Sequence, residues 1–284
     1  MTAPRYLSHS QLSTLRDCGE QYRLRYTERL ERQPMTAAVG GTIIHAVSET
    51  IDQHLLQGVN DAPTLKDAAS AEAQLVLDRE LAYVAEHSPS FTDPSTWLSF
   101  GKSGYQNLSF YMLEAVPAAI DNFIAWRAKT PNLVPLHIPN FGPAIEWPFV
   151  VAYMGRELRG VIDRIYQDVN TGVCVIVDIK SGAKPKNLSQ LGRYGYAVRA
   201  QDNPVLSKVR WGSYLYNLRR PSGDRVKPTY MSPVDLNWWT DQRLERYDSA
   251  AISMVEQGLF VPNPGEACFM CTLKHHCDFI EASL

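Results

Sequence analysis

The stretch ELRGVIDRIYQDVNTGVCVIVDIKS, residues 157–181, decides the fold of this chain. Its first half alternates apolar and polar residues, its second half is a nearly continuous apolar run, and the turn signal Asn170-Thr171-Gly172 separates the two. This pattern predicts two adjacent β-strands, over residues 156–167 and 172–180. We expect the first strand to be half exposed and the second to be buried in the centre of a sheet.

Three charged residues, Asp163, Asp178 and Lys180, interrupt this apolar hairpin. A buried carboxylate costs several kcal/mol unless it is paired or bound to a metal. Asp178 and Lys180 are two residues apart, so on a strand they point to the same face. If Asp163 lies opposite them, two carboxylates and an ammonium group converge. We interpret this group as a divalent-metal site with a cationic helper, and a surface ion pair at the end of a hairpin is the alternative.

The composition is that of an ordinary soluble protein, with 284 residues, 45% hydrophobic and 20% charged, and a formal net charge of −2. The N-terminus lacks the apolar core of a signal peptide, and no run of eighteen apolar residues exists, so we expect a cytoplasmic protein that does not span a membrane. Charge is unevenly distributed. The segment between Ser181 and Tyr230, directly after the metal motif, contains ten Lys and Arg residues and only two Asp residues. A basic segment beside a metal site suits a phosphate backbone.

The remaining periodicity predicts an α/β protein with a mixed central β-sheet flanked by helices, and with an N-terminal helical region. Helices are expected over residues 8–30, 42–56, 64–87, 104–129 with a kink at Pro117, 187–200, and 235–258 with Gly258 as the C-cap, and further strands over residues 145–153, 207–218 and 226–231. We expect one domain over residues 1–284, with a helical insertion at about 60–135 and a core at about 140–230.

The C-terminal segment carries clustered cysteines, Cys268-x2-Cys271-x5-Cys277. Clustered thiols in a chain without an export signal favour a metal over disulfides. Cys18 is the obvious fourth ligand, which would join the tail, residues 262–284, to the first helix. Cys174 lies in the predicted buried strand and is interpreted as a core residue.

Four thiolates suit a tetrahedral zinc ion or a 4Fe–4S cluster. Zinc sites usually show two close cysteine pairs, which this chain lacks. His275 or His276 could complete a local zinc site without Cys18, so zinc stays open.

The hairpin motif resembles that of the PD-(D/E)xK nuclease superfamily, in which an Asp on one strand and an (Asp/Glu)-x-Lys on the next hold a divalent metal. Here it reads Gly-Val-Ile-Asp163 followed by Asp178-Ile-Lys180, with Ile162 in place of the leading proline. Two further patterns resemble RecB-type nucleases. They are Gly41-x-x-x-His45 and Gln190-x-x-x-Tyr194.

The early cysteine and the C-x2-C-x5-C tail resemble the iron–sulfur subclass of RecB-like nucleases, which includes the AddB nuclease domain and the CRISPR-adaptation exonucleases. The resemblance implies a restriction-endonuclease-like core and a structural iron–sulfur cluster held by Cys18, Cys268, Cys271 and Cys277. The metal ligands that it implies for Mg²⁺ or Mn²⁺ are His45, Asp163, Asp178 and the backbone carbonyl of Ile179. The catalytic residues that it implies are Asp163, Asp178, Lys180, Gln190 and Tyr194, and the expected DNA contacts are Lys184, Lys186, Arg193 and Arg199.

The expected activity is metal-dependent hydrolysis at DNA ends, 5′-to-3′, in recombination, repair or phage DNA metabolism, and in the host cytoplasm if the protein is phage-encoded. A G-x-x-x-x-G-K-S/T loop is missing, so unwinding would fall to a helicase or recombination partner. One alternative is a non-catalytic DNA-binding or assembly subunit with a nuclease fold, against which the intact Asp163, Asp178 and Lys180 argue. Another is a zinc-stapled interaction protein.

Overall fold

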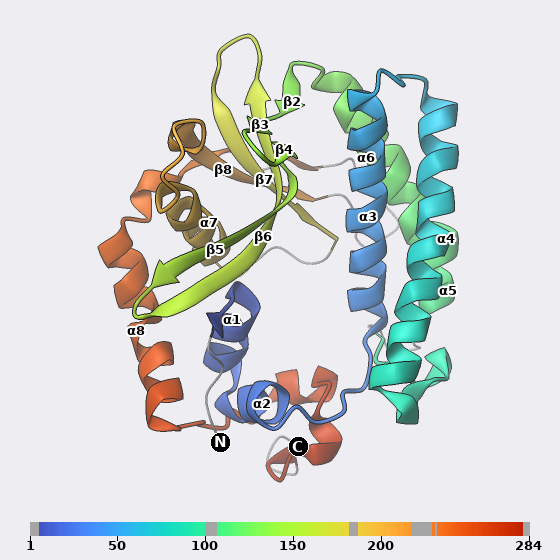
Figure 1. The fold of residues 1–284 in the computed structure, drawn as a ribbon. Coiled ribbons are helices and arrows are strands. Elements are labelled where there is room, and N and C mark those ends of the chain that lie inside the picture. Colours follow the sequence, from blue (N-terminus) through green and yellow to red (C-terminus); the bar gives the residue numbers. More distant parts are fainter. Residues whose placement is uncertain (1–5, 100–106, 182–186, 217–228, 231, 281–284) are drawn as a thin grey trace.

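The computed structural model describes residues 6–99, 107–181, 187–216, 229–230 and 232–280. A curled mixed sheet lies at its centre, between two groups of helices (Figure 1). The long strands of this sheet are β5 (Ile145–Tyr153), β6 (Arg156–Asp168), β7 (Cys174–Lys180) and β8 (Val209–Tyr216). The predicted α/β fold with a mixed sheet flanked by helices is confirmed.

The predicted hairpin is the centre of the sheet. β6 and β7 pair antiparallel in a register that places Arg164 opposite Val177. Gly172 adopts a positive φ of 73° in the turn between them. β7 pairs with β6 on one edge and with the parallel strand β8 on the other, and it is buried at every residue as far as Ile179 because both faces of the sheet are covered. The sheet is completed by β5 and short strands: β1 (Tyr6–Leu7), β2 (Leu133–Pro135), β9 (Thr229–Tyr230) and β10 (Val234–Asp235), while β3 (His137–Ile138) and β4 (Gly142–Pro143) form a separate pair.

Helices cover both faces of this sheet. One group contains α1 (His9–Asp17), α7 (Ser189–Arg199) and α8 (Asp241–Gln257), and the other contains α3 (Thr36–Leu56), α4 (Ala62–His87) and α6 (Val116–Lys129). Along β7, Ile176 packs in the first core and Val177 in the second, as strand alternation requires. The same alternation directs Asp178 and Lys180 toward α7.

The prediction of one continuous helix over residues 8–30 is wrong. The chain instead forms α1, then α2 (Gly19–Tyr22), then one π-helical turn over Arg23–Thr27. Cys18 breaks the helix by adopting an extended conformation, with φ −163° and ψ 116°. The Gly19 N–H donates to the Val261 carbonyl at 2.8 Å, and a Cβ on Gly19 would lie 2.4 Å from the Val261 nitrogen. The break thus lets the C-terminal segment pack directly against the start of the chain.

The other predicted helices are present with shifted ends. α3 starts at Thr36 rather than at residue 42, and α8 starts at Asp241 rather than at residue 235. α8 ends at Gly258 as predicted, in the left-handed conformation that favours glycine. Pro117 lies in the first turn of α6, preceded by α5 (Leu108–Phe110) and a π-helical turn over Tyr111–Ala115. Because proline has no N–H to donate, the hydrogen-bond pattern changes in the turn before it.

The predicted helical insertion, residues 60–135, contains α4 and α6. Both pack against α3, and the Trp126 ring on α6 contacts the Tyr166 ring on β6 at 5.8 Å between centroids. The division of the chain into insertion, core and tail stays a prediction. Among the described helices none is both long and apolar enough to cross a membrane.

Candidate metal centre

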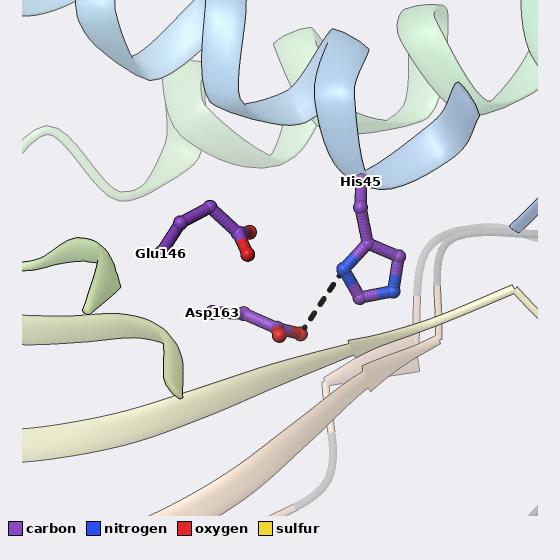
Figure 2. Close-up of side chains that lie close together, drawn as sticks. All are labelled: His45, Glu146 and Asp163. Carbon is purple, nitrogen blue, oxygen red and sulfur yellow. Dashed lines mark ion pairs between the residues drawn. The ribbon is translucent and has the colours of Figure 1, made fainter. Parts of the chain in front are cut away.

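Three potential metal ligands converge from three different elements (Figure 2). They are His45 on α3, Glu146 on β5 and Asp163 on β6, and one ligand atom from each lies within 4.8 Å of the other two. His45 Nδ1 is 3.4 Å from Asp163 Oδ2. Within the described ranges, no other group of three such residues meets this spacing. Carboxylate oxygens with one imidazole nitrogen suit Mn²⁺ or Mg²⁺, so these residues fit a divalent ion.

Glu146 was not predicted from the sequence. It adopts a positive φ of 47°, which is rare for a residue with a side chain, between the pairs Ile145–Arg164 and Trp147–Ile162 of the β5–β6 ladder. In an alternating strand a Glu between two apolar residues reads as a solvent-facing position. The local backbone conformation that turns its carboxylate toward Asp163 has no sequence signal that we recognise.

The groups of this cluster have shifted pKa values. Burial raises the pKa of Asp163, and burial together with the Asp163 carboxylate raises the pKa of Glu146. Burial lowers the pKa of His45, so its imidazole is neutral at neutral pH and its nitrogen can bind a metal. Crowded carboxylates that resist ionisation are the arrangement that a bound cation stabilises.

Asp178 and Lys180 lie beside this cluster, as predicted from their spacing. Lys180 Nζ is 2.5 Å from Asp178 Oδ2 and donates to Gln190 Oε1 at 2.9 Å. Gln190 Nε2 in turn donates to Asp178 Oδ1 at 2.9 Å and to the Tyr194 hydroxyl at 2.8 Å. The i, i+4 spacing on α7 thus places both polar side chains over the carboxyl end of β7.

Asp178 is linked to the cluster but is not one of its three closest members. Its pKa is raised to about 6 by burial and by the Asp163 carboxylate. Its Oδ2 atom is buried and, apart from the Lys180 ammonium, has no hydrogen-bond partner. The Ile179 N–H donates to Asp163 Oδ2 at 2.7 Å, which fixes Asp163 across the hairpin. A buried carboxylate oxygen that contacts only one ammonium group has lone pairs left for a metal ion, which is consistent with Asp178 as a further ligand.

Asp52 belongs to a structural ion cluster rather than to the metal centre. On α3 it lies two turns after His45, but its carboxylate is buried against Arg164 Nε at 2.7 Å and Arg127 Nε at 2.9 Å. Arg164 also reaches Glu146 Oε1 with Nη1, at 3.0 Å. One buried guanidinium therefore ties α3 to the sheet and holds Glu146 beside His45.

The basic residues that were expected to contact DNA differ in their exposure and in their ion pairs. Arg193 is 1% exposed and is paired with Asp248 on α8, and its role in DNA binding stays a prediction. Its basic side chain serves the packing of α7 on α8. Arg199 is partly exposed and pairs with Asp241, so its role in DNA binding stays a prediction. Lys184 and Lys186 lie outside the described residues.

The C-terminal segment of the described chain lies beside the N-terminal helices α1 and α2 (Figure 1). The Gln33 N–H donates to the Thr272 carbonyl at 2.8 Å, and His276 Nε2 donates to the Glu31 carbonyl at 3.1 Å. Burial raises the pKa of Cys271, and its neighbours Cys18, Cys277 and Cys268 raise it further. All four predicted thiols are therefore close to one another, whereas Cys174 is buried in the sheet.

Residues 6–278 match the PD-(D/E)XK nuclease superfamily, and the chain belongs to that superfamily. It is similar to the Gene 69 protein of Mycobacterium phage L5, with 26% identity over an alignment of 299 residues, which covers 95% of each chain. Among solved structures, it aligns with the crystal structure of SSO0001 at a TM-score of 0.40 and 11% identity, over 98% of this chain and 88% of that one.

Proposed function

We propose that this protein is a Mg²⁺- or Mn²⁺-dependent exonuclease that hydrolyses phosphodiester bonds at DNA ends. The observation that carries the proposal is the cluster of His45, Glu146 and Asp163 directly beside the Asp178–Lys180 pair. Membership of the nuclease superfamily supports hydrolysis of nucleic acid, and the metal-ligand chemistry supports the choice of ion.

The ion would be held by His45, Glu146, Asp163 and Asp178, with the Ile179 carbonyl as the further ligand that the family resemblance implies. When bound, a divalent ion polarises the scissile phosphate and lowers the pKa of a bound water. Lys180 would then offset part of the negative charge that develops during hydrolysis. Two of its three donors point to Asp178 and Gln190, so the third would be left to orient the attacking water.

Gln190 and Tyr194 act as positioning residues in this proposal. The amide of Gln190 bridges Lys180 and Asp178, and the Tyr194 hydroxyl lies 3.3 Å from Asp178 Oδ1. The pKa of Tyr194 is raised well above its ordinary value by burial and by Asp178, so its hydroxyl stays protonated and can donate. Both side chains thus hold the carboxylate and the ammonium group in a fixed orientation.

We further propose that Cys18, Cys268, Cys271 and Cys277 hold a structural 4Fe–4S cluster rather than zinc. One early cysteine before a C-x2-C-x5-C tail is the pattern that the family resemblance associates with an iron–sulfur cluster. Zinc is the alternative, with four thiolates or with His275 or His276 in place of Cys18.

Digestion at DNA ends, 5′-to-3′, is the mode that the RecB-like resemblance favours, and the phage origin of a relative supports a place in phage DNA metabolism or recombination. Unwinding would come from a separate helicase, because the chain has no G-x-x-x-x-G-K-S/T loop.

Digestion of end-labelled DNA tests this proposal. We expect the wild type with Mn²⁺ or Mg²⁺ to release label from 5′-labelled strands first, and Lys180→Ala to be slower by about a hundredfold or more, because a charge-stabilising group is lost. Circular DNA without ends is the control substrate. Wild-type protein that leaves all linear substrates intact with either metal would refute the nuclease assignment.

Metal dependence should change with pH. The pKa of Asp178, about 6 in the metal-free protein, means that protons compete with the ion below this pH. We expect the Mn²⁺ concentration for half-maximal activity to be constant above about pH 6 and to rise about tenfold per pH unit below it, for one competing proton. Metal titrations of activity at several pH values measure this. A half-maximal concentration that stays flat across the same range would exclude Asp178 as a metal ligand.

A further inference from the structure

A cavity adjoins the metal centre on the side of α1. It has a volume of about 170 Å³ and is bounded by His9 on α1, Arg159 on β6, and Arg193, Gln190 and Tyr194 on α7. Because Gln190 and Tyr194 contact Asp178 directly, one wall of the cavity is formed by the positioning residues of the catalytic site. The hollow beside His45, Glu49 and Glu146 is a different one, on the α3 side of the centre.

Excess positive charge lies beneath this cavity. Asp248 on α8 is fully buried and accepts from Arg193 Nη2 at 2.6 Å, and it also forms an ion pair with Arg16. Two guanidinium groups therefore share one carboxylate, and within the described residues no second carboxylate pairs with either of them. The cluster therefore carries net positive charge, with Arg193 buried and Arg16 partly exposed, and this charge favours the approach of an anion.

His9 presents a fixed hydrogen-bond donor at the same place. Its Nδ1 atom lies 2.6 Å from Arg193 Nη1. A guanidinium can only donate, so Nδ1 is the acceptor and the proton of the neutral ring is on Nε2. Burial and the cations Arg193, Lys180 and Arg16 lower the pKa of His9 to about 3, so the ring stays neutral at neutral pH.

We propose that this cavity binds a second phosphate group of the DNA strand, next to the one that is cleaved. His9 donates to this phosphate from Nε2, the Arg16–Arg193 pair supplies the long-range attraction, and Arg159 contributes from the partly exposed rim. This proposal rests on the nuclease function proposed above. Binding of the neighbouring phosphate would fix the position of the DNA strand relative to the metal centre. The phosphate is either the terminal one or an internal one, because both present anionic phosphoryl oxygens that accept hydrogen bonds from these donors.

Binding of DNA without metal tests the cavity independently of cleavage. The affinity of full-length protein in EDTA is measured by fluorescence anisotropy for duplexes labelled far from the tested end. The set contains a 5′-phosphate end, a 5′-hydroxyl end, and single neutral methylphosphonates at each of the first linkages. We expect one of these changes to weaken binding by wild type about tenfold, the effect of losing a charge-assisted hydrogen bond. The sensitive position tells whether the bound phosphate is terminal or internal.

His9→Ala provides the protein side of this test. It should bind unmodified DNA about tenfold more weakly than wild type and should no longer respond to the sensitive position. His9→Gln, which keeps a donor, should retain most of the response. His9→Ala that is folded, by an unchanged melting temperature, and that responds to every modification as wild type does would overturn the proposal.

Arg159→Gln tests the same phosphate cavity if His9→Ala does not fold. Removal of one phosphate contact should reduce the slope of log Kd against log salt by about 0.9, together with the response to the sensitive position. Arg79→Gln is the matched control, since Arg79 is also exposed and paired with a Glu, on the distant helix α4. Equal salt slopes in both variants would also contradict the cavity. Failure of wild type to cleave with metal would instead refute only the nuclease function.

Discussion

Replacement of Asp178 by alanine should abolish DNA cleavage while the protein stays folded. We expect the rate to fall by about a thousandfold or more, equivalent to about 4 kcal/mol of transition-state stabilisation. Asp178 is proposed to bind the ion and also directs Lys180, so its loss removes a metal ligand and disorders the cationic helper together. Single-turnover digestion of linear DNA, with the melting temperature of the same preparation, measures both effects.

The fold should tolerate this change because the buried carboxylate does not stabilise it. The pKa of Asp178 is raised to about 6, so its ionised form is disfavoured by folding. Asp52→Ala is the matched control, since it removes a buried Asp that pairs with Arg164 and Arg127. That change removes the carboxylate that Arg127 and Arg164 share, leaves Arg164 with only Glu146, and should cost about 3–5 kcal/mol of stability. Cleavage that survives in Asp178→Ala would remove Asp178 from the site.

Replacement of Cys271 by serine should strongly destabilise the protein. The C-terminal segment meets the start of the chain through a few hydrogen bonds, such as that between Gly19 and Val261, and through the four thiols. A hydroxyl is a poor ligand for the soft metals that thiolates bind, so the cluster would be lost or incomplete. Structural metal sites contribute of the order of 10 kcal/mol to folding, so most of the stability of this region should be lost.

Melting temperature, iron content and visible absorbance of Cys271→Ser report this loss. Cys174→Ser is the control, because Cys174 is a buried thiol on β7 that lies outside the cluster. It should keep its iron and colour and lose only about 1–3 kcal/mol of stability. Wild-type colour and melting temperature in Cys271→Ser would exclude a structural cluster, and a colourless wild type with stoichiometric zinc would favour the zinc staple.

The hairpin was predictable because both of its signals are local. Strict alternation and an apolar run identify β6 and β7, and the two-residue spacing of Asp178 and Lys180 already places them on one face. His45 was predicted as a metal ligand from the family resemblance, because no local sequence pattern distinguishes it from a structural histidine on a helix. The structure then placed it 3.4 Å from Asp163.

The remaining features depend on contacts between distant parts of the chain. Glu146 enters the metal centre through one left-handed residue in a strand, and a sequence pattern does not encode that conformation. The sequence does not show that Arg193 is buried, because its partner Asp248 is 55 residues away. The helix break at Cys18 arises from the packing of Val261, which a local prediction cannot include.

Crystals soaked in Mn²⁺ test the central claim most directly, because anomalous scattering locates the ion without any assay of activity. We predict one strong anomalous peak bounded by His45 Nδ1 and by carboxylate oxygens of Glu146, Asp163 and Asp178, at distances of about 2.0–2.3 Å. Absence of a peak there at saturating Mn²⁺, or a peak that contacts none of these side chains, would contradict the metal centre and the hydrolytic mechanism built on it.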